Sequence, residues 1–261
     1  MHTIDLDEAH LPPYLCCLEE WSSEMAEAGD HKARWYARMK ERGLRVKLAV
    51  DDDGAVAGMI HYLPIEESFI QGTGLYHVLC VWVHGYAEGV GRRQGHGLGA
   101  LLLHDAEEDA RRLGANGMSA WGLTIPVWMR ARWYRRHGYR PAERDGISLL
   151  VWKPFTPAAQ APRWIHPVRR PARVPGQVTV TAFINGWCPA QAITYERARR
   201  AAAEIGAPVV FEGIDTSDRE TFLVWGISDG LYIDGRGANI GPPQSYEQLR
   251  ARLLRAAQRL R

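Results

Sequence analysis

The chain has 261 residues, enough for two domains, and its 46% hydrophobic and 24% charged residues are ordinary for a soluble globular protein. Its formal net charge of +2 does not suggest a nucleic-acid partner, and no stretch approaches the roughly 20 apolar residues that would span a membrane. Acidic residues near the N-terminus, where a secretion signal carries positive charge, lead us to expect a cytoplasmic protein.

The first half of the chain alternates between helical and extended patterns. Residues from Leu15 to Met39 predict a helix-rich segment, because large apolar residues recur at roughly helical spacing. The expected strands are Arg45–Val50, Val56–Tyr62, Gly74–His84, Met118–Leu123 and Ile147–Trp152. Helices are expected at Leu98–Leu113 and Val127–His137, and a glycine-rich loop at Gly85–Gly97.

A proline- and arginine-rich segment, Thr156–Gln177, predicts a domain linker, with a long surface loop inside one domain as the alternative. We therefore expect domains at residues 1–155 and 178–261, joined by residues 156–177. The second domain has a β-α-β pattern. Its expected elements are strands at Val178–Ile184, Val209–Glu212 and Leu231–Ile233, and helices at Ala190–Ile205, Glu220–Val224 and Tyr246–Leu260.

The four cysteines are Cys16, Cys17, Cys80 and Cys188, and they form no CxxC pair. Neither a zinc ribbon nor a dithiol redox site is complete, so we predict no metal site and expect reduced thiols.

The strongest chemical signal is a glycine-rich turn between an expected strand and an expected helix. It reads Gln94-Gly95-His96-Gly97-Leu98-Gly99. Glycines let successive backbone N–H groups point inward at a pyrophosphate, and the helix start adds its positive dipole end. A dinucleotide-binding fold would need the glycines directly after a first strand and an acid about 20 residues later, whereas this turn follows antiparallel-looking strands.

A second element, Trp133 to Tyr139, has the pattern aromatic-Tyr-x-x-x-Gly-aromatic. In this order, the turn and this element resemble the GNAT superfamily of acetyltransferases over about Gly43–Phe155. The resemblance implies an α/β (α+β) domain with a mixed, mostly antiparallel sheet flanked by helices. It also implies acetyl-CoA as cosubstrate and a small-molecule amine as acceptor. The loop between Val83 and Gln94 is longer than usual, and it either reshapes the substrate entrance or is a mobile surface loop.

The resemblance also implies roles for single residues. The strand Leu79–Val83 should separate from its neighbour, so that its backbone binds the pantetheine arm. Tyr134 would be the general acid. His84 is the foremost candidate for the general base, beside Glu66, Glu67 and His77. The implied cofactor-binding residues are Val81, Trp82, Val83, Gln94, Gly95, His96, Gly97, Leu98, Gly99 and Ala100.

In the second domain, Trp187-Cys188-Pro189-Ala190-Gln191 resembles the WCxxC element of thioredoxin-like domains, with Gln191 in place of the resolving cysteine. A dithiol reductase is therefore not expected. A GNAT domain with adjacent cysteines near its start, followed by such a tail, resembles the YoaP-type acetyltransferases. Cys188 would be a retired redox position, a thiol or acyl relay, or a soft-metal ligand with Cys16 and Cys17. The alternative function is a catalytically silent sensor of CoA, soft metals or thiols.

Tryptophans near the expected cleft admit two interpretations. They would form an aromatic pocket for a flat or cationic substrate, or they would serve core packing. The residues concerned are Trp82, Trp121, Trp128 and Trp133.

Overall fold

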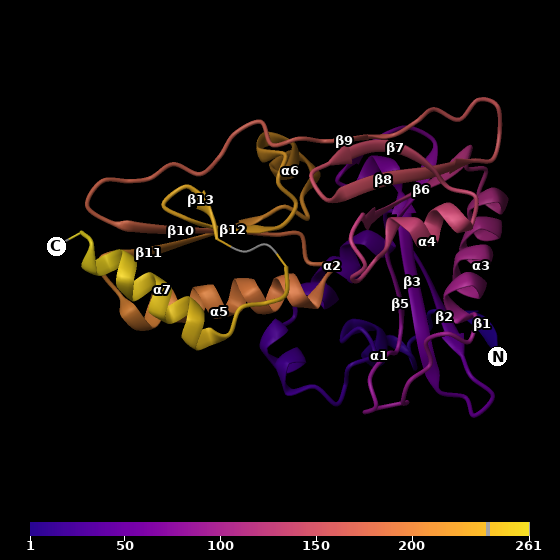
Figure 1. Cartoon of the computed structure of the whole chain (residues 1–261), viewed down its shortest axis with the longest axis horizontal. Coiled ribbons are helices and arrows are strands. Elements are labelled where there is room, and N and C mark those ends of the chain that lie inside the picture. The colour runs from indigo at the N-terminus through magenta and orange to yellow at the C-terminus, as the bar shows by residue number, and fades with distance from the viewer. Residues whose placement is uncertain (239–240, 261) are drawn as a thin grey trace. The chain divides into compact units, whose positions relative to one another are not determined.

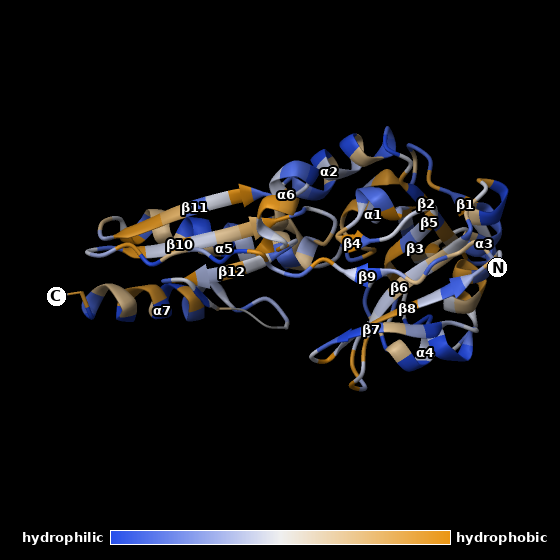
Figure 2. Ribbon diagram, turned by 90° about the horizontal axis from the view of Figure 1, so that it is seen from above, coloured by the Kyte–Doolittle hydropathy of each residue, from blue (hydrophilic) through white to orange (hydrophobic). Residues whose placement is uncertain are grey.

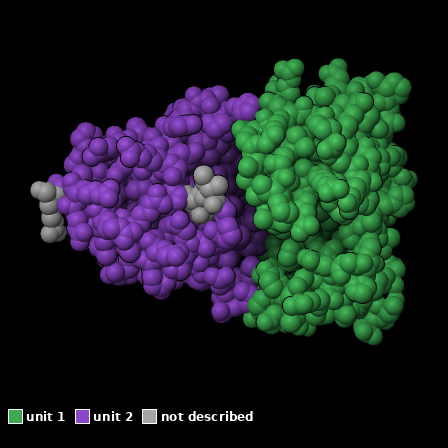
Figure 3. Space-filling model, in the orientation of Figure 1, with its two compact units in different colours: residues 1–21, 37–165 green, residues 22–36, 166–261 purple. Residues whose placement is uncertain are grey.

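The computed structural model describes residues 1–238 and 241–260, and the chain forms two compact units (Figure 3). The first unit contains residues 1–21 and 37–165, and the second contains residues 22–36 and 166–261. This division differs from the predicted one in two ways. The boundary falls after Ile165, inside the expected linker, and the segment 22–36 belongs to the second unit.

A seven-stranded sheet is the centre of the first unit (Figure 1). Every neighbouring pair is antiparallel except β5–β6, so the predicted mixed, mostly antiparallel sheet is confirmed. In spatial order the strands are β1 (His2–Asp5), β2 (Arg45–Val50), β3 (Val56–Pro64), β5 (Leu75–Val83), β6 (Gly117–Leu123), β8 (Ser148–Pro154) and β7 (Arg140–Asp145).

Helices cover both faces of this sheet, and adjacent residues of β3 show how, because successive side chains on a strand point to opposite faces. Tyr62 donates a hydrogen bond of 2.7 Å to Asp109 of α3 (Leu98–Arg112). Its neighbour His61 lies 2.9 Å from the hydroxyl of Tyr14, in α1 (Leu11–Leu15), on the other face. Apolar residues are concentrated along β3 (Figure 2), which places the core at the middle of the sheet.

Two segments of the first half that were expected to be helical are shorter or more divided than the pattern suggests. The segment Leu15–Met39 contains the end of α1, a 3₁₀ helix η1 (Ser23–Ala28) and α2 (His31–Lys40). Between α1 and η1, Cys17 and Leu18 have φ of 54° and 64°, which no continuous helix permits. The helix expected from Val127 begins only at Ala131, as α4 (Ala131–Arg136), because Met129 has φ of 50°.

Part of the expected linker is attached to the first unit. The short strand β9 (Arg163–Trp164) pairs antiparallel with β4 (Ile70–Gln71), which follows the 3₁₀ helix η2 (Ile65–Glu67). The backbone N–H of Trp164 also donates to the Glu143 carboxylate at 2.8 Å. These bonds explain why the boundary between the units lies after residue 165.

The second unit is built on a four-stranded sheet in the order β11-β10-β12-β13. β10 is parallel to β11 and antiparallel to β12, and β12 is antiparallel to β13. Helices α5 and α7 pack against this sheet around a core of small and branched apolar residues. The elements are β10 (Val178–Ile184), α5 (Pro189–Ile205), β11 (Val209–Asp215), α6 (Arg219–Trp225), β12 (Gly230–Ile233), β13 (Arg236–Gly237) and α7 (Tyr246–Gln258).

An ion-pair cluster explains why residues 22–36 belong to the second unit. The Arg197 side chain on α5 is buried and contacts Glu24 and Glu27 of η1 at 2.7 and 2.6 Å. The two hydrogen bonds from Arg197 lower the pKa of Glu27, so this carboxylate stays charged and paired.

Within the described residues, no helix has both the length and the apolar character needed to cross a lipid bilayer.

Candidate active site

The candidate site begins where β5 and β6 stop pairing. The two strands run parallel from Leu75 opposite Gly117 to Val78 opposite Ala120, and pairing ends there. At the next residue, Leu79, β5 has a bulge against β3, since His61 pairs with Cys80 and Tyr62 with Val78. A bulge bends and twists its strand. β5 therefore stays with β3 as far as Val83 while β6 leaves it, which is the separation predicted for Leu79–Val83.

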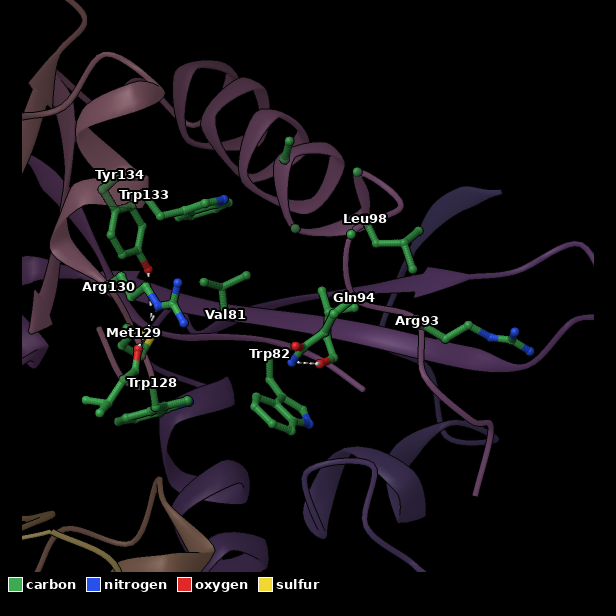
Figure 4. A pocket seen from close by; sticks show the side chains of 16 residues that line it. Val81, Trp82, Arg93, Gln94, Leu98, Trp128, Met129, Arg130, Trp133 and Tyr134 are labelled. Carbon is green, nitrogen blue, oxygen red and sulfur yellow. Dashed lines mark hydrogen bonds between the residues drawn. The ribbon is translucent and has the colours of Figure 1, made fainter. Parts of the chain in front are cut away.

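A cleft of about 720 Å³ lies at this separation, lined by sixteen residues (Figure 4). Tyr134 and nine of the ten predicted cofactor-binding residues line it. His96 does not; it is exposed in the turn. The nine are Val81, Trp82, Val83, Gln94, Gly95, Gly97, Leu98, Gly99 and Ala100.

The glycine-rich turn has the geometry of an anion cradle. Gly95 and Gly97 have φ of 87° and 82°, and a Cβ added at either would meet no atom within 4 Å. Gly97 is the N-cap of α3 and supplies no side-chain acceptor, so the first-turn N–H groups face the open space. Gln94 donates a hydrogen bond of 3.0 Å to the Val83 carbonyl and so ties the turn to the end of β5. The arrangement suits a pyrophosphate.

Gly99 has a different task. A Cβ at this position would lie 3.3 Å from the ring of Trp133, so glycine allows α3 and α4 to approach closely.

Tyr134 lies on α4 and lines the cleft although its side chain is fully buried in the free protein. Its hydroxyl donates to the sulfur of Met129 at 3.9 Å. Burial, with a contribution from the nearby Cys80, raises the pKa of Tyr134 well above its usual value. The hydroxyl is therefore protonated at neutral pH and able to donate a proton.

His84, the foremost predicted base, has well-defined structural contacts. It does not line the cleft, and both of its ring nitrogens are engaged. Nε2 accepts the indole N–H of Trp21 at 3.2 Å, so Nδ1 carries the proton and donates to the Gly91 carbonyl at 2.8 Å. The Arg93 backbone N–H also donates to the His84 carbonyl at 2.9 Å. His84 thus holds the long loop in place, and its role as a base stays a prediction.

The other candidate bases also lie outside the cleft lining. His77 is buried, its Nδ1 lies 2.9 Å from the Ser119 hydroxyl, and burial lowers its pKa to about 3. Glu66 accepts the Gly74 backbone N–H at 2.7 Å, and Glu67 pairs with Arg42 at 3.1 Å. These groups serve the core and nearby loops.

The fold and the cleft agree with the comparison against known families. The family model described as "Acetyltransferase (GNAT) family" matches residues 5–139, just over half of the chain. The chain belongs to the GNAT acetyltransferase family. No curated protein matches it.

Solved GNAT structures resemble about three fifths of the chain. A GNAT family acetyltransferase from Brucella melitensis, in complex with acetyl-CoA, is 17% identical over 60% of this chain and 88% of its own (TM-score 0.39). YhbS from Escherichia coli, in complex with CoA, is 18% identical over 58% and 79% (TM-score 0.41). The PaiA N-acetyltransferase from Thermoplasma acidophilum, in complex with coenzyme A, is 15% identical over 59% and 100% (TM-score 0.44).

This GNAT cleft also has lining residues that the sequence did not predict as cofactor-binding or catalytic. Most lie on the loop before α4, which was expected to be the first part of the helix Val127–His137. They are Arg93, Val127, Trp128, Met129, Arg130 and Trp133. The signal that marks this loop is Gly122: a Cβ there would lie 2.6 Å from the Met129 carbonyl, so only glycine lets the loop fold back on β6.

The cysteines of this GNAT protein form no disulfide. Within residues 1–238 and 241–260, no group of three or more His, Cys, Asp or Glu side chains is arranged to hold a metal ion. The Cys188 residue directly precedes α5 as its N-cap.

Proposed function

We propose that the chain transfers an acetyl group from acetyl-CoA to an amine of a small molecule, with Tyr134 as general acid. The observation that carries this proposal is the single cleft that unites the glycine turn, the unpaired end of β5 and Tyr134. The turn would bind the pyrophosphate, and the backbone of β5 beyond Val78 would bind the pantetheine arm as an added strand.

The reaction follows from the order of groups along the cleft. The acceptor nitrogen attacks the thioester carbonyl carbon, and a C–N bond forms while the C–S bond breaks. The departing thiolate takes the hydroxyl proton of Tyr134, and the proton lost by the nitrogen passes to solvent and restores the tyrosine. Burial keeps Tyr134 protonated until the thiolate forms.

For the second unit we propose a thioredoxin-like domain, which makes the chain a YoaP-type acetyltransferase of the cytoplasm. The strand order β11-β10-β12-β13, with one parallel pair and a cysteine at the start of α5, supports this proposal. Gln191, where a resolving cysteine would stand, argues against dithiol chemistry.

Acetyl-CoA binding to Gly97→Trp, measured by calorimetry, tests the cofactor site. The indole would fill the pyrophosphate cradle, so we expect binding to be lost. Gly54→Trp is the matched control, because Gly54 has φ of 81°, equally open space and a place in the β2–β3 turn outside the cleft lining. Equal affinity of the two variants would count against the site.

Transfer itself is tested by thiol release from acetyl-CoA in the presence of an amine library. Release that depends on the amine supports the enzyme. Tight acetyl-CoA binding without release for any amine would instead favour the silent sensor.

A further inference from the structure

The four tryptophans at or beside the cleft have different surroundings. Trp133 packs against Gly99 and, at 4.4 Å between ring centroids, against His137. Trp121 donates its indole N–H to the Leu79 carbonyl. Trp82, Trp128 and also Trp133 line the cleft, and for Trp82 and Trp128 no hydrogen bond joins the indole N–H to a described residue. Trp133 and Trp121 thus have close packing or hydrogen-bonding contacts, whereas Trp82 and Trp128 line the cleft without an indole hydrogen bond.

These two indoles lie on the face of β5 that is opposite α3. Val83 faces α3, since a Cβ on Gly99 would lie 3.8 Å from it, and side chains alternate along a strand, so Trp82 points the other way. Figure 4 shows the indoles of Trp82 and Trp128 on one side of β5 and that of Trp133 on the other. Trp128 is 40% exposed, and its ring packs edge-to-face against that of Trp121, with 5.5 Å between the ring centroids. Both indoles therefore line the cleft on the face of β5 opposite α3.

The charge of the lining is one-sided. The sixteen residues include two arginines and no Asp, Glu or His. Arg93 is paired with Asp51 at 3.2 Å. Arg130 donates from Nε to the Val127 carbonyl at 3.2 Å, and no described carboxylate pairs with its guanidinium. Figure 4 shows Arg130 beside Tyr134, at the end of the cleft away from Leu98, so a pyrophosphate held at the glycine turn would not reach it.

This lining suits some amines and disfavours others. An alkyl ammonium group would find no anion to attract it, and no lining base would remove the proton that blocks its attack. An amine on an aromatic ring is uncharged at neutral pH, because its lone pair is delocalised into the ring, and it needs no such base. A flat ring also stacks on indole, and a carboxylate suits an unpaired guanidinium.

We propose that the acceptor is an aromatic amine bearing an acidic group, with its ring against Trp82 and Trp128 and its carboxylate on Arg130. This proposal rests on the proposed acetyl transfer. The uncharged nitrogen attacks with its lone pair, and a C–N bond forms while the C–S bond breaks. The thiolate takes the Tyr134 proton, and the proton lost by the nitrogen passes through solvent and restores the tyrosine. The products are the aryl acetamide and CoA.

Matched substrates test the amine. 4-Aminobenzoate and 4-(aminomethyl)benzoate share the ring and the carboxylate, but only the second is an ammonium ion at pH 7. We expect kcat/KM for 4-aminobenzoate to exceed that for 4-(aminomethyl)benzoate. We expect kcat/KM for 4-aminobenzoate to exceed kcat/KM for aniline, which lacks the carboxylate, by roughly tenfold to a hundredfold. A preference for the aminomethyl compound or for spermidine overturns the proposal.

Matched variants test the residues. Arg130→Gln should lower kcat/KM for 4-aminobenzoate by roughly tenfold or more while leaving that for aniline unchanged. Trp128→Ala should lower both, by about fivefold. Arg132→Gln is the control, because Arg132 is exposed and outside the lining. Equal losses for both substrates in Arg130→Gln overturn the role of its charge.

The two proposals fail in different ways. If the wild-type chain does not bind acetyl-CoA, the proposed function fails. If acetyl-CoA binds but no amine is acetylated, calorimetry of 4-aminobenzoate with the CoA-loaded chain decides the acceptor site. Binding that Arg130→Gln abolishes supports the inference, and no binding, or binding unchanged by Arg130→Gln, overturns it.

Discussion

The indole N–H of Trp121 donates to the carbonyl of Leu79 over 2.9 Å, at the first position where β5 and β6 no longer pair. The bond replaces the strand pairing that would otherwise bind this carbonyl. It lets the two strands separate without leaving a polar group unsatisfied, and the cleft opens at that point.

Trp121→Phe should therefore destabilise the chain. The ring remains but the donor is lost, and an unsatisfied carbonyl beside the cleft costs about 1–3 kcal/mol in the free energy of unfolding. Urea denaturation would measure the loss. The control is Trp82→Phe, since the buried Nε1 of Trp82 has no hydrogen-bond partner among the described residues. We expect no comparable loss there, and equal destabilisation by both variants would contradict the role of the Trp121 bond.

Tyr134→Phe should lower kcat by roughly a hundredfold, the scale of general acid catalysis, with acetyl-CoA affinity nearly intact. Because burial raises the pKa of Tyr134, the wild-type rate should not fall through loss of this proton below the ordinary tyrosine pKa of about 10. Tyr139→Phe is the control: Tyr139 is equally buried, with a raised pKa, and lies outside the lining. An unchanged kcat in Tyr134→Phe would remove it as the acid.

His84→Ala should weaken acetyl-CoA binding and loosen residues 85–93, because it removes the side-chain bonds to Trp21 and Gly91. Hydrogen exchange of the loop and calorimetry would show this, while kcat at saturating acetyl-CoA should change little. The exposed His104, on α3, provides the control variant His104→Ala. A large fall in kcat with an unperturbed loop would restore His84 as a base.

His77 makes stability depend on pH. Its pKa is about 3 in the folded chain against 6.5 for the ordinary side chain, so the unfolded chain binds the extra proton first as pH falls. Its contribution to stability is complete above pH 6.5 and is lost progressively toward pH 3. Between pH 7 and pH 5 the free energy of unfolding of the wild type, measured by urea denaturation, should fall by about 2 kcal/mol more than that of His77→Gln. Parallel losses in the two chains would show that another group is responsible.

Local patterns predicted several elements of both units. The bounds of β2 and β10 and the start of α3 at Leu98 agree with expectation, because apolar periodicity and the glycine turn act locally. β7, with the residues Arg140-Pro141-Ala142-Glu143-Arg144-Asp145, has no such periodicity; it is a strand because the edge of β8 offers its backbone partners.

Long-range contacts explain the other differences. Glu24 and Glu27 pair with Arg197, which lies about 170 residues away in the sequence, and no local pattern predicts this pairing. Similarly, His84 looked available for proton transfer until the fold placed Trp21 on one ring nitrogen and Gly91 on the other. The glycine turn and Tyr134 were predicted from motifs, whereas the position of Arg130 in the cleft depends on the path of the loop before α4.

The pairing of Arg197 with η1 bears on how this protein can be dissected. A fragment starting at residue 166 would leave a buried guanidinium without both of its carboxylates, and removing one side of such a pair typically costs about 3–5 kcal/mol. Residues 166–261 alone are therefore not expected to form a stable domain. An excised version needs residues 22–36 grafted back, for example by a peptide bridge ahead of β10.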